Sequence, residues 1–97
     1  MSLPDSFLEM ISNFGFTLEG ESSYEEDGMM VNVKTHSLAK GAEKFVATAS
    51  VWSNGFQRFS VKRFKNDQFK EAIWVETEAD IQKTTQRLEK LILGSNK

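Results

Sequence analysis

A short polar turn, Ser53 to Gly55, separates two runs of residues that favour β-strands, and this combination is typical of a β-hairpin. The length of the turn fixes which side chains face each other. A two-residue turn would place Ala47 opposite Lys62, and neither side of the hairpin would then be apolar. A three-residue turn instead places Ala47 opposite Val61. Because a slip of one residue sends every side chain to the other face, we predict the three-residue turn.

The predicted turn places Gly55 in the left-handed conformation of a G1 bulge, which glycine adopts without steric cost. It also sorts the hairpin into two faces. The predicted buried face is apolar and consists of Phe45, Ala47, Ala49, Val51, Phe59 and Val61. The predicted exposed face mixes aromatic, small and basic residues in four cross-strand pairs: Trp52 with Phe56, Ser50 with Arg58, Thr48 with Ser60, and Val46 with Lys62. One face can therefore join a core while the other meets solvent.

Apolar residues at helical spacing predict a helix at each end of the chain. The first runs from about Pro4 to Phe14 and ends at Gly15, in a Schellman motif. The second begins after Thr77, which forms a capping box with a carboxylate three residues later, and ends at Gly94. The two apolar stripes are Phe7, Leu8, Ile11 and Phe14 in the first helix and Ile81, Leu88, Leu91 and Ile92 in the second.

The rest of the chain predicts further strands. We expect one at residues 16–24, an acidic turn at 25–28, a half-buried strand at 29–34, a loop at 38–43 and a last strand around 73–75. Together these predict a two-layer α+β sandwich. Its sheet is a mostly antiparallel meander of about five strands, with the N-terminal and C-terminal helices packed on one face. The other face of the sheet is expected to be open.

The composition fits one small globular domain over residues 1–97, with 39% hydrophobic and 27% charged residues. There is no cysteine, so a disulfide framework and a cysteine-ligated metal are excluded, and we expect a cytoplasmic protein. The first residues do not resemble a signal peptide, and no segment approaches the roughly 18 apolar residues of a membrane span. We therefore expect no association with a membrane.

The net charge of -2 conceals a strong asymmetry along the chain. Residues 1–28 hold seven acidic residues and no basic ones, whereas residues 29–70 hold eight basic residues and two acidic ones. The middle of the chain therefore favours an acidic partner. The acidic first third opposes the binding of phosphates wherever it comes close to the basic residues.

The motifs that could carry catalysis or bind metal are incomplete. Gly15 to Ser22 have the spacing of a phosphate-binding loop, but Glu21 occupies the position of the essential lysine and would repel phosphates. The acidic turn, read as a calcium-binding loop, has Lys34 where the bidentate glutamate belongs. His36 is the only histidine, and we expect it at an exposed strand end. We predict no enzyme, metal site, cofactor or small-molecule substrate.

The exposed face of the hairpin carries the strongest functional signal. We expect three apolar anchors to lie among three cations there, in a surface composed of Trp52, Phe56, Phe64, Lys34, Arg58 and Lys62. Aromatic anchors beside cations form a docking patch for an acidic partner. A structural alternative is that Trp52 and Phe56 are only a cross-strand pair that packs beneath a loop.

Two kinds of partner fit this predicted patch. A protein partner, or a second copy of the chain in a homodimer, would use both the apolar anchors and the charge asymmetry. A single-stranded nucleic acid would stack its bases on the same rings and place phosphates on the same cations. The sequence pI of about 5.4 argues against nucleic acid, since dedicated binders usually exceed about 9. We rank a non-catalytic protein-interaction module first and nucleic-acid binding second.

Overall fold

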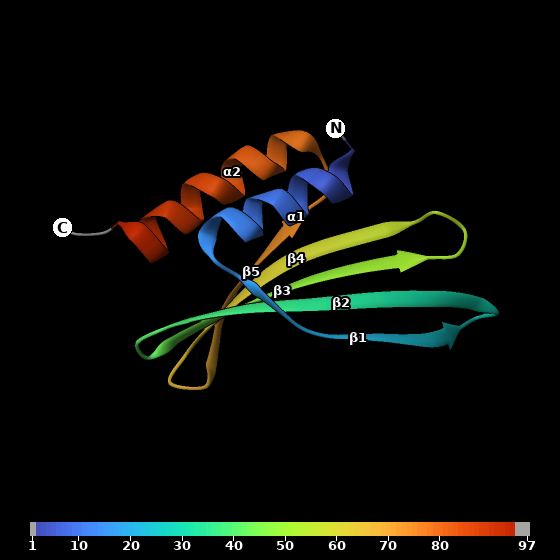
Figure 1. Cartoon of the computed structure of the whole chain (residues 1–97), viewed down its shortest axis with the longest axis horizontal. Helices are drawn as coiled ribbons and strands as arrows, with labels where there is room; N and C mark the ends of the chain where they lie inside the picture. The colour runs from blue at the N-terminus through green and yellow to red at the C-terminus, as the bar shows by residue number, and fades with distance from the viewer. Residues whose placement is uncertain (1, 95–97) are drawn as a thin grey trace.

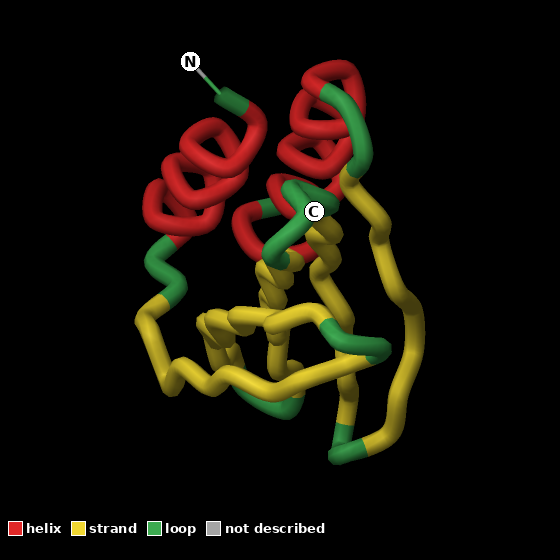
Figure 2. Tube along the Cα trace, turned by 90° about the vertical axis from the view of Figure 1, so that its right-hand side faces the viewer, coloured by secondary structure: helices red, strands yellow, loops and turns green. Residues whose placement is uncertain are grey.

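The computed structural model describes residues 2–94 of the chain (Figure 1). In chain order the elements are α1 (Leu3–Phe14), β1 (Thr17–Glu26), β2 (Met29–Lys40), β3 (Glu43–Trp52), β4 (Gln57–Lys65), β5 (Gln68–Val75), α2 (Glu78–Leu88) and the π-helical turn η1 (Glu89–Leu93). The strands form one antiparallel sheet in the order β1-β2-β3-β4-β5. Both helices lie on the same side of this sheet (Figures 1 and 2). The predicted α+β sandwich with a five-stranded meander is therefore confirmed. We call the uncovered side of the sheet the open face.

The predicted helix ends are confirmed by their hydrogen bonds. At the end of α1, Gly15 has a φ of 97° and its N–H donates to the carbonyl of Ser12, while the N–H of Phe16 donates to the carbonyl of Ile11. This is the Schellman pattern, and Phe16 is buried beside it. At the start of α2, Thr77 accepts from a backbone N–H in a complete capping box. These caps set the direction in which the chain enters and leaves the sheet.

The hairpin formed by β3 and β4 has the predicted register. Ala47 lies opposite Val61, and Ala49 lies opposite Phe59. The three-residue turn closes with the N–H of Trp52 donating to the carbonyl of Phe56 over 2.8 Å. Gly55 has a φ of 95°, in the left-handed region that the predicted bulge requires. The apolar side of the hairpin consequently faces the helices.

Four local expectations were wrong. Ser60, expected on the exposed face of the hairpin, is only 4% exposed, and the acidic turn expected at 25–28 is confined to 27–28 because β1 continues to Glu26. The predicted loop at residues 38–43 does not form, because β2 continues to Lys40 and β3 begins at Glu43. Pairing of Leu38 with Phe45 extends the ladder, so only a two-residue turn at 41–42 remains. His36 therefore lies inside β2, half-buried and opposite Ala47, rather than at an exposed strand end.

The core lies between the helices and strands β3 to β5. The ring of Phe7 in α1 lies 5.0 Å from the ring of Phe59 in β4, and the ring of Phe16 lies 6.5 Å from that of Phe45 in β3. The buried cluster consists of Phe7, Met10, Ile11, Phe16, Phe45, Ala47, Ala49, Phe59, Val61, Val75, Leu88 and Ile92. Strand β1 contributes nothing to this cluster, since all ten of its residues are exposed. Apolar burial therefore holds one half of the sheet, while β1 is held mainly by its ladder to β2.

Candidate interaction face

An arginine surrounded by aromatic rings occupies one end of the open face. Trp52 is the last residue of β3, and Phe56 lies across the turn from it, with their ring centroids 5.0 Å apart and edge to face. Arg58 follows on β4 and lies opposite Ser50. Trp74, on β5, points to the same side because it pairs with Ser60. We call these four residues, Trp52, Phe56, Arg58 and Trp74, the Arg58 cluster.

The guanidinium of Arg58 contacts all three rings of this cluster. Its Cζ lies 5.8 Å from the ring centre of Trp52, 5.7 Å from that of Phe56 and 5.9 Å from that of Trp74. A cation–π contact contributes about 0.5–1 kcal/mol at an exposed site, and one guanidinium shared among three rings at nearly 6 Å does not add three full contributions. Phe56 and Trp74 are each 51% exposed, so the rings hold the arginine without covering it. Among residues 2–94, Arg58 makes no ion pair with a carboxylate.

The structure brings together some of the predicted patch. Trp52, Phe56 and Arg58 lie together, and Lys62 lies on the same face farther along β4, opposite Val46 and Ala72. Phe64 lies still farther along this face, where its ring packs 5.9 Å from that of Phe69.

Lys34 lies apart from this group. It pairs with Ala49, whose side chain is buried beneath the helices, and with Glu21 on its other side. Residues directly opposite one another in an antiparallel ladder point to the same face. Lys34 therefore belongs to the side of the sheet that the helices occupy, and it does not join the Arg58 cluster.

Sequence reasoning missed Trp74. Strand alternation already signalled its outward orientation, because it precedes buried Val75. What the sequence did not reveal is its neighbour, since the pairing of β5 with β4 passes through a bulge between Arg63 and Phe64. This third ring completes the group around Arg58.

The acidic strand lies at the opposite edge of the sheet from β5. Four glutamates occupy β1: Glu19, Glu21, Glu25 and Glu26. Two strands separate β1 from β4, which corresponds to about 14 Å at the usual strand spacing. This distance exceeds the Debye length of about 8 Å at physiological salt, so the acidic edge acts only weakly on Arg58. The molecule thus carries an acidic edge and a cationic aromatic face as separate surfaces.

The other two arginines are paired with carboxylates. Arg63 lies 3.0 Å from Glu43 and 3.0 Å from Glu71, and Arg87 of α2 lies 2.8 Å from Glu71. Hydrogen bonds from Arg87, and secondarily from Arg63, lower the pKa of Glu71 below its ordinary value. This network ties β3, β4, β5 and α2 together and is structural in character.

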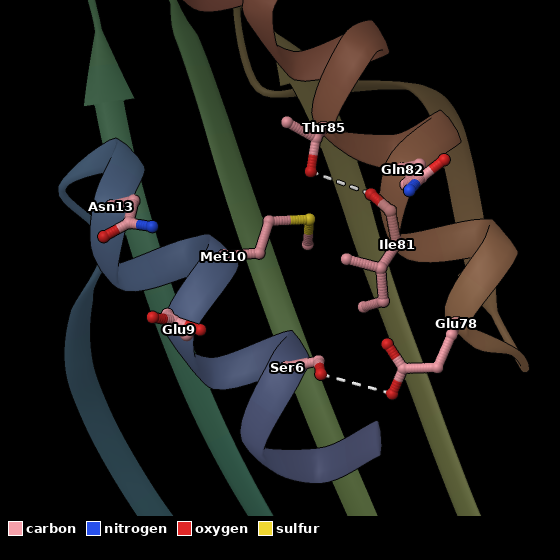
Figure 3. Close-up of a pocket in the computed structure, with 8 residues that line it drawn as sticks. All are labelled: Ser6, Glu9, Met10, Asn13, Glu78, Ile81, Gln82 and Thr85. Atoms are coloured by element: carbon pink, nitrogen blue, oxygen red, sulfur yellow. Dashed lines mark hydrogen bonds between the residues drawn. The ribbon is translucent and has the colours of Figure 1, made fainter. Parts of the chain in front are cut away.

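A hollow of about 330 Å³ lies between the two helices (Figure 3). The hydroxyl of Ser6 donates to Glu78 over 3.2 Å, and that of Thr85 donates to the carbonyl of Ile81 over 2.8 Å. The hollow is lined by Ser6, Glu9, Met10, Asn13, Glu78, Ile81, Gln82 and Thr85. This lining includes no histidine, lysine or cysteine that would activate a nucleophile.

Groups associated with metals or acid-base chemistry are sparse elsewhere. No three histidine, aspartate or glutamate side chains within residues 2–94 converge in a way that would hold a metal ion. Burial, and then the charge of Lys34, lowers the pKa of His36 below its ordinary value. His36 is therefore mostly neutral at pH 7. The Arg58 cluster is therefore the candidate site that we consider further.

Comparisons with known proteins give no assignment: no protein-family model matches the chain, and neither a curated protein nor a solved structure is significantly similar to it. Within the described part of the chain, neither helix has the length and apolar character needed to cross a membrane.

Proposed function

We propose that this protein is a non-catalytic protein-interaction module that docks an acidic partner, or a second copy of itself, through the open face. The observation that supports this proposal most is the environment of Arg58, whose guanidinium is held by three rings and by no carboxylate of residues 2–94. An arginine in this state keeps its hydrogen-bond donors available for a partner.

The aromatic rings around Arg58 should strengthen the binding of a partner as well as orient the guanidinium. Tryptophan and arginine are the residues most enriched at the centres of protein interfaces. Two of the rings, Phe56 and Trp74, expose about half of their surface and so offer apolar area to a partner. Because the rings already restrict Arg58, ordering this side chain on binding costs less than the usual 0.5–1.5 kcal/mol or so.

Single-stranded nucleic acid is the second candidate. Exposed rings beside a guanidinium form a surface on which bases stack, and Lys62 would supply a second cation for phosphates. Only a few cations lie on the open face, however, and the sequence pI of about 5.4 is far below that of typical nucleic-acid binders. These observations favour a protein partner.

Selection from a random peptide library displayed on phage tests the proposal. We expect wild-type protein to enrich peptides that are rich in Asp, Glu and aromatic residues. The double variant Arg58→Glu, Lys62→Glu should bind these peptides at least about tenfold more weakly, because repulsion replaces attraction. The variant Lys83→Glu, Lys90→Glu makes the same change in net charge in the C-terminal helical segment, and it should bind like wild type.

Two further measurements separate the kinds of partner. The mass of the protein in solution, measured in parallel, detects the homodimer. Titration with a labelled single-stranded oligonucleotide at low and physiological salt tests the second candidate, since phosphate binding weakens steeply with salt. Failure to enrich acidic peptides from a monomeric protein would overturn the first proposal. Oligonucleotide binding that survives physiological salt would replace it with the second.

A further inference from the structure

A hollow of about 330 Å³ lies beside the Arg58 cluster, where β4 begins and β5 ends. Phe56, Arg58 and Trp74 contribute to its wall. The remaining lining residues are Leu3, Gly55, Gln57, Phe59, Val75 and Glu76. The hollow thus borders the open face and reaches the start of α1.

The hollow exists because β4 begins before its pairing with β5 does. The last pair between these strands is Phe59 with Val75, so no residue of β5 lies opposite Gln57. The chain turns away at this point because the carboxylate of Asp80 accepts hydrogen bonds from the N–H groups of Glu76 and Thr77, 2.9 and 3.0 Å away. The capping box of α2 therefore leaves a gap in the sheet.

The gap exposes main-chain groups as well as side chains. Trp52 donates to Phe56 across the hairpin, so the next residue, Gln57, directs its N–H and C=O away from β3. These groups point toward the side where β5 has ended. A ligand in the hollow would meet a backbone donor there, together with the guanidinium of Arg58 and apolar walls from Phe56 and Trp74.

We propose that this hollow is the anchor site of the open face, and that it seats one apolar side chain of an acidic partner while Arg58 binds a carboxylate next to that side chain. This inference rests on the proposed function and specifies its chemistry. The volume suits a single aromatic or branched aliphatic side chain with space to spare, and the planar guanidinium matches a carboxylate through two parallel hydrogen bonds.

Glu76 gives the proposal a distinctive signature. Glu76 lines the hollow and is exposed, and its carboxylate forms no ion pair among the described residues. An incoming carboxylate is therefore attracted by Arg58 and repelled by Glu76. Removing each charge in turn should move affinity in opposite directions, which a purely apolar hollow would not do.

The test is a nuclear magnetic resonance titration of the 97-residue protein with N-acetyl-L-phenylalanine, and with N-acetyl-L-phenylalanine amide as the probe that lacks the carboxylate. We expect the acid to shift the signals of the Gln57 amide, the Trp74 indole and the Leu3 methyl groups. The amide should bind about tenfold more weakly, as expected for the loss of a charge-assisted hydrogen bond. Arg58→Gln should weaken binding of the acid by a similar factor, and Glu76→Gln should strengthen it. The control Lys83→Gln removes a charge in α2, away from the hollow, and should change binding less than about twofold.

Equal binding of acid and amide, or shifts that bypass Gln57 and Leu3, would overturn the proposal. The outcome is distinguishable from failure of the proposed function. If selected acidic peptides bind the protein but leave the signals of Gln57 and Leu3 unchanged, the anchor site is refuted and the interaction module stands. If N-acetyl-L-phenylalanine binds as expected but no acidic peptide is selected, the hollow is a site for small carboxylates and the proposed interaction module fails.

Discussion

Arg63 and Arg58 lie on the same strand and on opposite faces of the sheet, and they are held in different ways. Arg63, on the helix-covered face, is fixed by Glu43 and Glu71 at 3.0 Å each and exposes 17% of its side chain. Arg58, on the open face, is exposed and is fixed by three rings alone. The charge of Arg63 is neutralised within the fold, whereas that of Arg58 is available to a ligand.

The contrast separates stability from binding. On the covered face, apolar burial and paired charges make each side chain depend on its neighbours. On the open face, Phe56, Arg58 and Trp74 contribute less to folding because they remain in contact with water. Under the proposed function, substitutions should therefore divide into those that destabilise the fold and those that only weaken binding to the proposed partner.

The largest difference in stability between the two faces is expected when a phenylalanine on each face is replaced by alanine. Phe45→Ala removes a ring with no exposed surface, and we expect it to lower the free energy of unfolding by about 3–5 kcal/mol. Phe56→Ala removes a ring that is 51% exposed and should cost less than about 1.5 kcal/mol. Denaturant titration of the two variants provides the measurement. Similar losses for both would show that the open face is part of the core.

The next effect concerns the two arginines themselves. Arg63→Ala leaves the half-buried carboxylates of Glu43 and Glu71 without this partner, and we expect a loss of roughly 1–3 kcal/mol in the free energy of unfolding. Arg58→Ala loses only exposed ring contacts and should cost no more than about 1 kcal/mol. Thermal unfolding of both variants tests whether Arg63→Ala is the more destabilised of the two. A greater loss of stability in Arg58→Ala would contradict this expectation.

A smaller effect is expected in the pH dependence of stability, through Glu71. The pKa of Glu71 in the folded protein lies below its ordinary value of 4.5, mainly because Arg87 donates hydrogen bonds to it. Its contribution to stability is therefore fully present above about pH 4.5 and is lost as pH falls through the folded pKa. The melting temperature of wild type should fall more steeply between pH 5 and pH 3 than that of Glu71→Gln. Arg58→Ala, as a matched control on the open face, should keep the slope of wild type.

The smallest expected effect is a gain of stability. Thr84 is 1% exposed, and its hydroxyl has no hydrogen-bond partner among the described residues. Thr84→Val removes this unpaired polar group at nearly constant volume and should raise the free energy of unfolding by up to about 1 kcal/mol. Thr85→Val is the control, because its hydroxyl donates to Ile81 and its removal should give no gain. A loss in Thr84→Val would show that this hydroxyl is paired in solution.

Much of the fold follows from local patterns in the sequence. The register of the β3–β4 hairpin was predictable because a period of two and a turn glycine at Gly55 allow only one apolar face. The ends of both helices were predictable from Gly15 and Thr77, whose roles depend on neighbouring residues only. The predicted loop at 38–43 was wrong because its polar composition concealed a strand pairing with residues farther along the chain.

The candidate site was less predictable. Local alternation placed Trp52, Phe56 and Arg58 together. The position of Trp74 beside Arg58 depends on how β5 pairs with β4, and the hollow depends on where that pairing stops. Neither can be predicted from a local sequence pattern. Lys34 was grouped with the patch because residues distant in sequence could not be assigned to a face without the β2–β3 register.

The most direct test of the separation between stability and binding is to measure, on one preparation of Arg58→Gln, both its free energy of unfolding and its affinity for the selected acidic peptides. We predict an unfolding free energy within about 1 kcal/mol of wild type, together with binding that is at least about tenfold weaker. Unchanged affinity would contradict the account, because Arg58 would then not bind the partner. A large loss of stability would contradict it equally, because Arg58 would then belong to the fold rather than to a docking face.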